Sequence, residues 1–302
     1  MRRPGGHGPI LLFGAGGQVG STLLTGLADA FGSNLIVPDR ARADFASPES
    51  VREIIRQTRP SLIVNAAAYT AVDAAESDRE LAFLVNRETP TAIAEEASKY
   101  GAFFIHYSTD YVFDGQGSQP YKEGDPAAPV NVYGESKLAG EHGVAAASDR
   151  YIIFRTSWVY ADQGRNFLNA MRGLAETKTE LRIVSDQTGC PTWAGAIAEA
   201  TLEAITLITG NAEEKRDFSG IYHLCATGHT TWAGFAKAIF ERICLEPPRI
   251  IPISTEEYAL PAPRPRYTVL DTTRAEECFA IRMPSWERQL DDCLSSSKIP
   301  TN

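Results

Sequence analysis

The sequence predicts an α/β protein built on a doubly wound parallel sheet. Three observations indicate this fold: short apolar runs alternate with helix-length amphipathic segments, several of these runs are apolar without interruption, and a glycine-rich turn follows the first run. Uninterrupted apolar strands are typical of parallel sheets that helices cover on both faces. The connections between such strands are expected to be right-handed crossovers.

The expected elements alternate regularly in the first half of the chain and less regularly afterwards. Buried strands are expected at residues 10–13, 35–37, 62–65, 103–108 and 152–156. The helices expected between them span residues 18–30, 47–57, 79–100 and 133–147. In the second half we expect helices at 166–175, 192–208, 231–243 and around 286–294, a strand at 220–226, and proline-rich irregular chain from 247 to 265.

Composition narrows the classes of function. The chain has 302 residues and a formal net charge of −9, which argues against nucleic acid or an anionic membrane as the main partner. Its five cysteines are scattered and form no CxxC pair, so we expect reduced thiols, no metal site and a cytoplasmic location. No secretory signal is recognised, and no stretch approaches the roughly 20 apolar residues of a membrane span.

The glycine-rich turn predicts a dinucleotide site. Gly14, Gly17 and Gly20 follow the first expected strand directly and open a helix. Glycines at these positions allow a tight turn, close approach of a diphosphate to backbone N–H groups, and tight packing of helix on strand. We therefore expect residues 1–160, with returning segments near 193–240, to form a dinucleotide-binding domain. Residues 161–192 and 241–302 are expected to form a smaller C-terminal substrate-binding lobe.

The residues after the second expected strand leave the choice of cofactor open. Asp39 lies about twenty residues past the last motif glycine, where an acid can accept hydrogen bonds from an adenosine ribose and favour NADH. Arg40 follows it, and a guanidinium there can accept the 2′-phosphate of NADPH. We expect NADPH or NADH.

A phenol and an ammonium spaced for one helical face form the candidate catalytic pair. Tyr133 and Lys137 are four residues apart, so their side chains lie on the same face of the helix. The Lys137 charge is expected to stabilise the phenolate form of Tyr133. Thr109 falls at the carboxyl end of an expected strand, where its hydroxyl can hydrogen-bond to the phenol. Such a group can give a proton to a carbonyl oxygen or take one from a hydroxyl.

Taken in chain order, these motifs resemble the extended short-chain dehydrogenase/reductases. They are the glycine turn, Asn65-Ala66-Ala67, Ser108-Thr109-Asp110 and the pair four residues apart. Longer strings are similar to the dTDP-4-dehydrorhamnose reductase family: NAAAYTAVDAAE at 65–76, STDYVFDG at 108–115, VYGESK at 132–137, RTSWVY at 155–160 and SDQTGCPT at 185–192. The resemblance spans residues 10 to about 290.

The resemblance implies a Rossmann-like domain, a small substrate lobe and a defined reaction. That reaction is the NAD(P)H-dependent reduction of the C4 ketone of dTDP-4-dehydro-6-deoxy-L-mannose to dTDP-L-rhamnose, with hydride from the nicotinamide and a proton from Tyr133. The implied cofactor contacts are Gly14, Gly17, Gln18, Val19, Gly20, Asp39, Arg40, Asp44, Phe45, Ala66, Ala67, Ala68 and Lys137. The implied substrate contacts are Thr109, Asp110, Trp158 and Arg264, the last near the diphosphate.

Departures from the family pattern bear on assembly and on the alternatives. Some members form dimers bridged by Mg²⁺ through glutamates, whereas this chain has Ser21-Thr22 and Gly195-Ala196 at two of those places. We therefore expect a monomer or a metal-free homodimer. Two other functions stay open: a non-catalytic regulatory subunit of the methionine adenosyltransferase type, and another sugar-nucleotide epimerase or reductase. A dehydratase is less favoured, because Thr109 is followed by Asp110-Tyr111 and not by an Asp-Glu pair.

Overall fold

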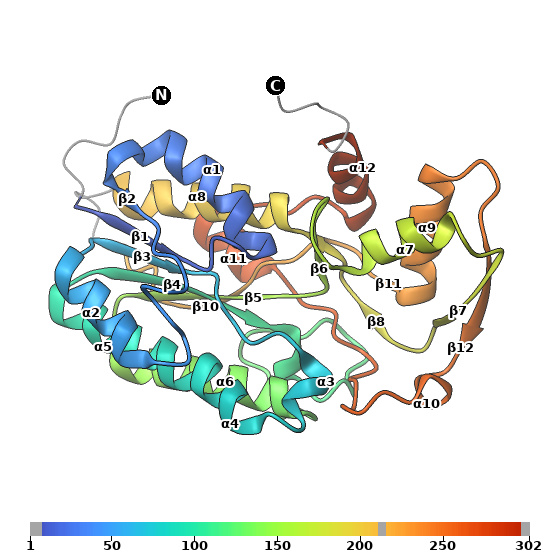
Figure 1. Ribbon diagram of the computed structural model, residues 1–302, viewed down its shortest axis with the longest axis horizontal. Helices are drawn as coiled ribbons and strands as arrows, with labels where there is room; N and C mark the ends of the chain where they lie inside the picture. The colour runs from blue at the N-terminus through green and yellow to red at the C-terminus, as the bar shows by residue number, and fades with distance from the viewer. Residues whose placement is uncertain (1–7, 211–215, 297–302) are drawn as a thin grey trace.

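A six-stranded parallel sheet forms the centre of the molecule. The computed structural model describes residues 8–210 and 216–296, and the sheet runs in the order β10-β5-β4-β3-β1-β2 (Figure 1). Its strands are β1 (Ile10–Phe13), β2 (Leu35–Ile36), β3 (Leu62–Asn65), β4 (Phe103–Thr109), β5 (Tyr151–Thr156) and β10 (Gly220–His223). The predicted doubly wound α/β fold is confirmed.

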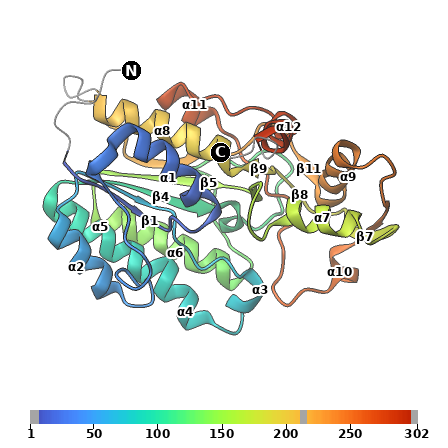
Figure 2. The ribbon, with the colours of Figure 1, turned by 45° about the horizontal axis from the view of Figure 1, so that its top comes forward.

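Helices cover both faces of this sheet (Figures 1 and 2). Successive residues of β1 point to opposite faces, so Ile10 and Leu12 belong to one core cluster and Leu11 and Phe13 to the other. The first cluster packs under α1 (Gln18–Phe31), α8 (Ala194–Gly210) and α11 (Thr273–Phe279). The second packs under α2 (Pro48–Thr58), α5 (Thr89–Tyr100) and α6 (Val132–Ala147).

A third cluster forms the core of a smaller lobe beyond the carboxyl ends of the strands (Figure 1). It joins α7 (Phe167–Ala175), α9 (Trp232–Ile243) and α12 (Trp286–Ser296) to the parallel pair β7 (Glu180–Val184) and β12 (Arg249–Ile253). Residues 232–240 of α9 were expected to return to the sheet domain, but Phe235 and Ile239 lie in this lobe core. Conversely, Phe279 of α11 lies in the first sheet core although residues 241–302 were expected in the lobe.

Several elements differ in detail from the expectations. The helical run at 79–100 consists of α4 (Arg79–Phe83), a π-helical segment (Leu84–Glu88) and α5. The helix expected from 192 begins at Ala194, because β9 (Thr192–Trp193) pairs with β6 (Val159–Tyr160). The proline-rich stretch contains β12, in which Pro252 lies opposite Ile183 of β7. The remaining short elements are the 3-10 turns η1 (Gly32–Asn34) and η3 (Asp110–Val112), α3 (Val72–Ala75), β8 (Thr188–Gly189), β11 (Thr230–Thr231) and α10 (Thr255–Tyr258).

The strand order determines where on the sheet a ligand site is expected. From β1 the sheet extends to β2 on one side and to β3, β4, β5 and β10 on the other. The carboxyl ends of β1 and β3 therefore flank the point at which the winding reverses, which is where open α/β sheets bind their ligands. The glycine turn follows β1 and the Asn65-Ala66-Ala67 segment ends β3, so both lie at this point.

Candidate active site

The glycine turn between β1 and α1 fits closely against the segment after β3. Gly14 has a backbone φ of +79°, and a Cβ there would lie 2.4 Å from the backbone nitrogen of Ala67. A Cβ at Gly20 would lie 2.1 Å from the Gly14 carbonyl oxygen, so glycine lets α1 approach the turn. No side chain caps α1 at Gly17 and no acid lies in its first turn. The amide N–H groups of this helix end can therefore donate to an anion.

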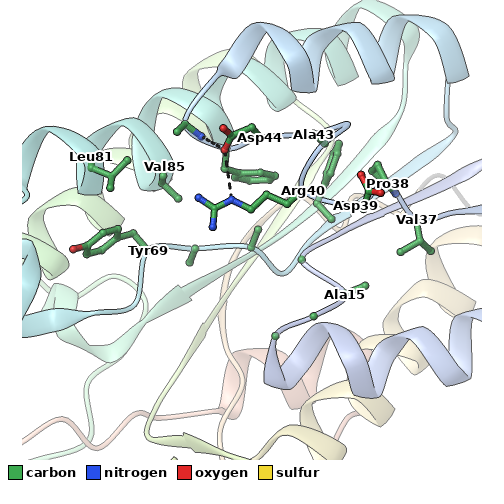
Figure 3. Close-up of a pocket in the computed structure, with 18 residues that line it drawn as sticks. Ala15, Val37, Pro38, Asp39, Arg40, Ala43, Asp44, Tyr69, Leu81 and Val85 are labelled. Carbon is green, nitrogen blue, oxygen red and sulfur yellow. Dashed lines mark hydrogen bonds and ion pairs between the residues drawn. The ribbon is translucent and has the colours of Figure 1, made fainter. Parts of the chain in front are cut away.

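A cavity of about 800 Å³ opens beside this turn (Figure 3). Its walls come from the segments that follow β1, β2 and β3, and from Leu81 of α4 and Val85 of the π-helical segment. The volume lies within the range of about 300–1,000 Å³ that small-molecule and cofactor sites occupy. Of the residues expected at the cofactor, those that line it are Gly14, Gly17, Asp39, Arg40, Asp44, Phe45, Ala67 and Ala68. The glycine turn and the cavity together fit a dinucleotide.

The other residues expected at the cofactor lie beside this lining and not in it: Gln18, Val19, Gly20, Ala66 and Lys137. The Gln18 amide donates to the Val159 carbonyl at 3.4 Å and so connects α1 to β6. The Ala66 backbone N–H donates to the Phe13 carbonyl at 3.0 Å and extends the sheet ladder past β3. Their contacts with a cofactor stay predictions.

The end of the cavity formed by the loop after β2, where the adenosine is expected, is polar and exposed. One carboxylate oxygen of Asp39 accepts the Arg42 backbone N–H at 3.0 Å, which fixes the loop after β2. Figure 3 shows Arg40 directed toward Asp44 across the cavity, with 3.9 Å between its Nε and the carboxylate. The Arg40 side chain is 90% exposed. Phe45 packs against the second sheet core. An acid and an unburied guanidinium both line this end of the cavity, which fits the expectation of NADPH or NADH.

The three predicted catalytic side chains come together at the carboxyl end of β4 and the start of α6. Thr109 is the last residue of β4. The side chain of Asn131 accepts the Gly134 N–H at 2.8 Å, and this cap starts α6. Tyr133 and Lys137 then lie one turn apart on the helix, with the phenol beside the Thr109 hydroxyl.

Burial dominates the acidity of the phenol. It raises the pKa of Tyr133 to about 12, the Asp110 charge acts in the same direction, and the Thr109 hydroxyl opposes both. The Lys137 charge was expected to stabilise the phenolate, but it is not among the influences on this pKa. Burial favours the proton-carrying form of Tyr133.

Lys137 is buried among acceptors and not beside a carboxylate. Its side chain is 2% exposed, and its ammonium nitrogen donates to the Tyr107 carbonyl at 2.6 Å and lies 3.3 Å from His106 Nε2. Burial lowers the pKa of Lys137 to about 8, and Glu141, one turn further along α6, opposes that effect. Burial thus weakens the usual preference of a lysine for the ammonium form.

Asp110 holds the hydroxyl groups around Thr109. One carboxylate oxygen accepts from Thr109 at 3.0 Å and the other from Ser157 at 2.8 Å, and Thr268 also donates to this carboxylate. The residue is 2% exposed, and burial raises its pKa to about 6 against these hydrogen bonds. Asp110 therefore orients Thr109, while its expected contact with the sugar stays a prediction.

Trp158 stands in a strained backbone conformation at the start of the lobe. Its φ is +46°, which is uncommon for a bulky residue. Its ring stacks on Trp232 with centroids 3.6 Å apart and planes 4° from parallel. The Trp232 indole N–H donates to the Gln187 side chain at 3.0 Å. A Cβ at Gly189 would lie 2.5 Å from the Trp158 ring, so glycine makes room for the stack. The second face of Trp158 is not part of this stack.

Arg264 bridges the proline-rich segment and α3. Its guanidinium lies 2.8 Å from an Asp73 carboxylate oxygen and donates to the Ala262 carbonyl at 2.8 Å. The other Asp73 oxygen accepts the Ala262 backbone N–H at 3.2 Å. Asp73 belongs to the string at 65–76, so this ion pair connects that string to the lobe. A contact between Arg264 and a diphosphate stays a prediction.

Sequence reasoning missed four residues that shape the site: His106, Glu141, Trp232 and Asp73. A histidine within an otherwise apolar strand was a sign for His106, because a fully buried imidazole needs polar partners. Glu141 continues the four-residue spacing of Tyr133 and Lys137. Trp232 is far along the chain from its stacking partner Trp158, and nothing in the local sequence indicates that contact.

Residues 8–210 and 216–296 contain neither a metal-binding cluster nor a membrane-spanning helix. Within these residues no group of three or more His, Cys, Asp or Glu side chains could hold a metal ion. No helix of that part of the chain is long and apolar enough to cross a membrane.

Comparisons with known proteins identify the family. A family model described as the RmlD substrate-binding domain matches residues 8–299. The dTDP-4-dehydrorhamnose reductase of Escherichia coli K12 is 44% identical over 303 residues, covering 96% of this chain and 99% of the relative. The same-named protein of Burkholderia thailandensis is 44% identical over 293 residues, covering 94% and 97%.

Solved structures agree with this assignment. The crystal structure of dTDP-4-dehydrorhamnose reductase from Bacillus anthracis in complex with NADP superimposes with a TM-score of 0.88 at 32% identity, covering 96% of this chain and 100% of that one. With the glycine turn, the cavity and the Thr109–Tyr133–Lys137 cluster in place, the chain belongs to the dTDP-4-dehydrorhamnose reductase family.

Proposed function

We propose that this protein reduces the C4 ketone of dTDP-4-dehydro-6-deoxy-L-mannose to dTDP-L-rhamnose with NADPH or NADH. The observation that carries the proposal is the position of Thr109, Tyr133 and Lys137 at the sheet edge that also holds the glycine turn. The predicted reductase function and NAD(P) cofactor are confirmed by the family and its NADP complex. Neither the regulatory-subunit nor the epimerase alternative is favoured by these relatives.

The proposed roles of the chain's own groups follow from their surroundings. Bound reduced nicotinamide supplies a hydride to C4. Tyr133 gives its proton to the carbonyl oxygen: its O–H bond breaks and the electron pair remains as a phenolate. Lys137 as an ammonium stabilises that phenolate, and Thr109, held by Asp110, positions the phenol. A phenol whose pKa is raised by burial keeps its proton until the ketone is present.

The sugar nucleotide is proposed to lie between the sheet edge and the lobe. Trp158, supported by Trp232, offers an aromatic face beside the Thr109 cluster, and Arg264 offers a cation at the proline-rich segment. This proposal includes the division into a dinucleotide-binding domain and a substrate lobe. It assigns α9 to the lobe and α11 to the sheet domain, because that is where their buried residues pack.

Assembly and location are also proposals. A monomer or metal-free homodimer is supported by Ser21-Thr22 and Gly195-Ala196 at places where some relatives carry bridging glutamates. Gly195 is packed against Trp193, whose ring lies 2.3 Å from the place a Cβ would take, so an acid could not replace it without a shift. A cytoplasmic location is supported by the five scattered cysteines, which form no CxxC pair. Light scattering with EDTA or with added Mg²⁺ tests the assembly: a mass that depends on Mg²⁺ contradicts it.

A coupled assay tests the reaction. The 4-keto sugar nucleotide is generated enzymatically, the purified protein is added with NADPH or NADH, and oxidation of the nicotinamide is followed by absorbance. We expect oxidation only when the dTDP-linked 4-keto sugar is present. A UDP-linked 4-keto sugar serves as the matched control for the base. Correctly folded protein that turns over neither cofactor would return the regulatory-subunit alternative to first place.

A further inference from the structure

Three buried polar side chains form a continuous chain from the cofactor loop to Lys137. The Asn65 amide nitrogen lies 3.1 Å from His106 Nδ1, and His106 Nε2 lies 3.3 Å from Lys137 Nζ. Asn65 and His106 are 0% exposed and Lys137 is 2% exposed. Their hydrogen bonds must therefore be satisfied by one another and by nearby backbone.

The orientation of Asn65 is fixed by the backbone. Its Oδ1 accepts the N–H of Ala67 at 3.0 Å, and a backbone N–H can only donate. The atom that faces His106 Nδ1 is thus the amide nitrogen, which also only donates. Nδ1 has to accept, so a neutral His106 carries its proton on Nε2.

That tautomer determines which protonation state of Lys137 can complete the hydrogen bonds. The Nε2–H group points at Lys137 Nζ, which itself donates to the Tyr107 carbonyl at 2.6 Å. An amine has a lone pair and can accept from Nε2–H, whereas an ammonium has none. If Lys137 is an ammonium, His106 must accept through Nε2 and carry its proton on Nδ1. That proton then opposes the Asn65 amide, and a buried hydrogen bond is lost.

We propose that Asn65 and His106 are positioning residues that disfavour the ammonium form of Lys137 and so tie its protonation state to the backbone of the cofactor loop. All the hydrogen bonds of the three side chains are satisfied together only with an Nε2–H imidazole and a neutral amine. Protonation of Lys137 requires the His106 tautomer to change and the Asn65 contact to break. Because Asn65 is also bonded to Ala67, which lines the cavity, the same event loosens the loop expected to pass the nicotinamide.

The other groups around Lys137 do not remove this constraint. From α6 itself, Tyr133 is neutral because burial raises its pKa, and Glu141 favours the ammonium. From β5, Arg155 pairs with Glu141 through two hydrogen bonds of 2.9 and 2.6 Å and offsets that charge. From β4, burial keeps the pKa of His106 well below its usual range against a hydrogen bond to the Asn65 backbone, so His106 stays neutral. From η3, Tyr111 is also neutral because burial raises its pKa.

The inference rests on the proposed catalytic role of Lys137 for its functional meaning, but its test does not. The first measurement uses the protein without cofactor. Heteronuclear NMR of isotope-labelled histidine reports which ring nitrogen of His106 carries the proton, and labelled lysine reports the titration of Lys137. We expect the Nε2–H tautomer, and a Lys137 side chain that titrates below the ordinary lysine range.

Two variants separate hydrogen-bond geometry from charge. Asn65→Asp turns the donor toward His106 into an acceptor and should move the imidazole proton to Nδ1. Asn65→Ala removes the donor without adding charge and should free the tautomer. Both should raise the pKa of Lys137, by about one unit or more in the neutral variant. His142→Gln is the matched control: His142 lies on α6 outside the network, and its replacement should change neither signal.

The pH profile of the reduction provides the functional readout. If the ammonium is the working form, kcat/KM falls as Lys137 loses its proton, and Asn65→Ala should move that decline to higher pH. A purely structural role would lower the rate at all pH values without moving the decline. An Nδ1–H tautomer in the unaltered protein overturns the proposal, as does a Lys137 titration that is the same in all variants. Absence of turnover with the expected NMR result would contradict only the proposed function.

Discussion

The two ends of the candidate site hold similar charged side chains in opposite surroundings. At the end formed by the loop after β2, where the adenosine is expected, Arg40 and Asp44 lie 3.9 Å apart and are 90% and 44% exposed. At the catalytic end, Glu141 and Arg155 form a bidentate ion pair close to the buried Lys137, and their side chains are 0% and 4% exposed. Water and salt screen the first pair and can barely reach the second. The exposed end can recognise a phosphate without a fixed geometry, whereas the buried end holds fixed protonation states.

This difference in burial determines how much each ion pair matters for the free energy of unfolding. An exposed ion pair contributes about 0–1 kcal/mol, and its replacement is nearly neutral. Removal of one partner from a buried pair leaves a charge without compensation and costs about 3–5 kcal/mol. The shifted acidities of Tyr133, Lys137 and Asp110 all lie at the buried end and all have desolvation as their largest cause.

Tyr133→Phe should give the largest effect. The variant keeps the ring that packs against Tyr111 and removes only the proton donor. We expect kcat/KM to fall by roughly 10²–10⁴-fold, the usual contribution of a positioned acid, while cofactor affinity stays within a few-fold. The coupled assay and calorimetric titration with NADPH measure the two quantities. Retained turnover would remove Tyr133 from the mechanism.

Glu141→Gln compared with Asp44→Asn tests the buried and exposed pairs directly. The neutral amide of the first variant would leave the buried Arg155 guanidinium without its counter-charge, so the free energy of unfolding should fall by about 3 kcal/mol or more. Asp44→Asn should change it by less than about 1 kcal/mol. Urea denaturation at one pH gives both values. Equal losses from the two variants would show that the contrast in exposure does not govern stability.

Asp110→Asn should remove a pH dependence of the free energy of unfolding that arises from the buried carboxylate. The pKa of Asp110 is raised to about 6 in the folded state, from an ordinary value of 3.8. The stabilisation that this raised pKa provides is fully present below the ordinary value and is lost as pH rises through about 6. The variant lacks this dependence. Its free energy of unfolding relative to the unaltered protein should therefore rise by about 1–3 kcal/mol between roughly pH 4 and pH 7. Denaturation curves at several pH values measure it, and a constant difference would contradict the burial effect.

Local sequence patterns were sufficient for the sheet domain. Apolar runs and glycine spacing predicted β1, β3 and the turn at Gly14, because each of these depends on neighbouring residues. The lobe was less predictable. β12 contains Pro252 and pairs with β7, which lies far earlier in the chain, so neither its composition nor its neighbours indicated a strand. The segment of α9 was expected in the sheet domain and that of α11 in the lobe, but their buried residues pack the other way round. An amphipathic face does not specify which core it covers.

The residues of the candidate site also fall into two groups, those that local sequence patterns predict and those that depend on the fold. Tyr133, Lys137 and the glycines follow from spacing within one element. The network of Asn65, His106 and Lys137 joins β3, β4 and α6, and the orientation of the Asn65 amide depends on a backbone N–H two residues away. Such contacts need the register of the parallel strands, in which Asn65 lies opposite His106. A sequence pattern contains both residues but not their pairing.

Arg40→Ala should give the smallest effect, and it bears on cofactor choice at the exposed end. Loss of a guanidinium that is 90% exposed should weaken NADPH binding by no more than about five-fold, close to 1 kcal/mol, and leave NADH binding unchanged. Because the contact is screened, the loss should shrink at high salt. Asp39→Ala is the matched control and should weaken NADH more than NADPH, since the carboxylate can accept from a ribose hydroxyl but repels a 2′-phosphate. Titrations of both cofactors at two salt concentrations decide the matter. A loss of NADPH affinity greater than about a hundred-fold, insensitive to salt, would mean that Arg40 becomes buried around the phosphate, and the two ends of the site would then be alike when the cofactor is bound.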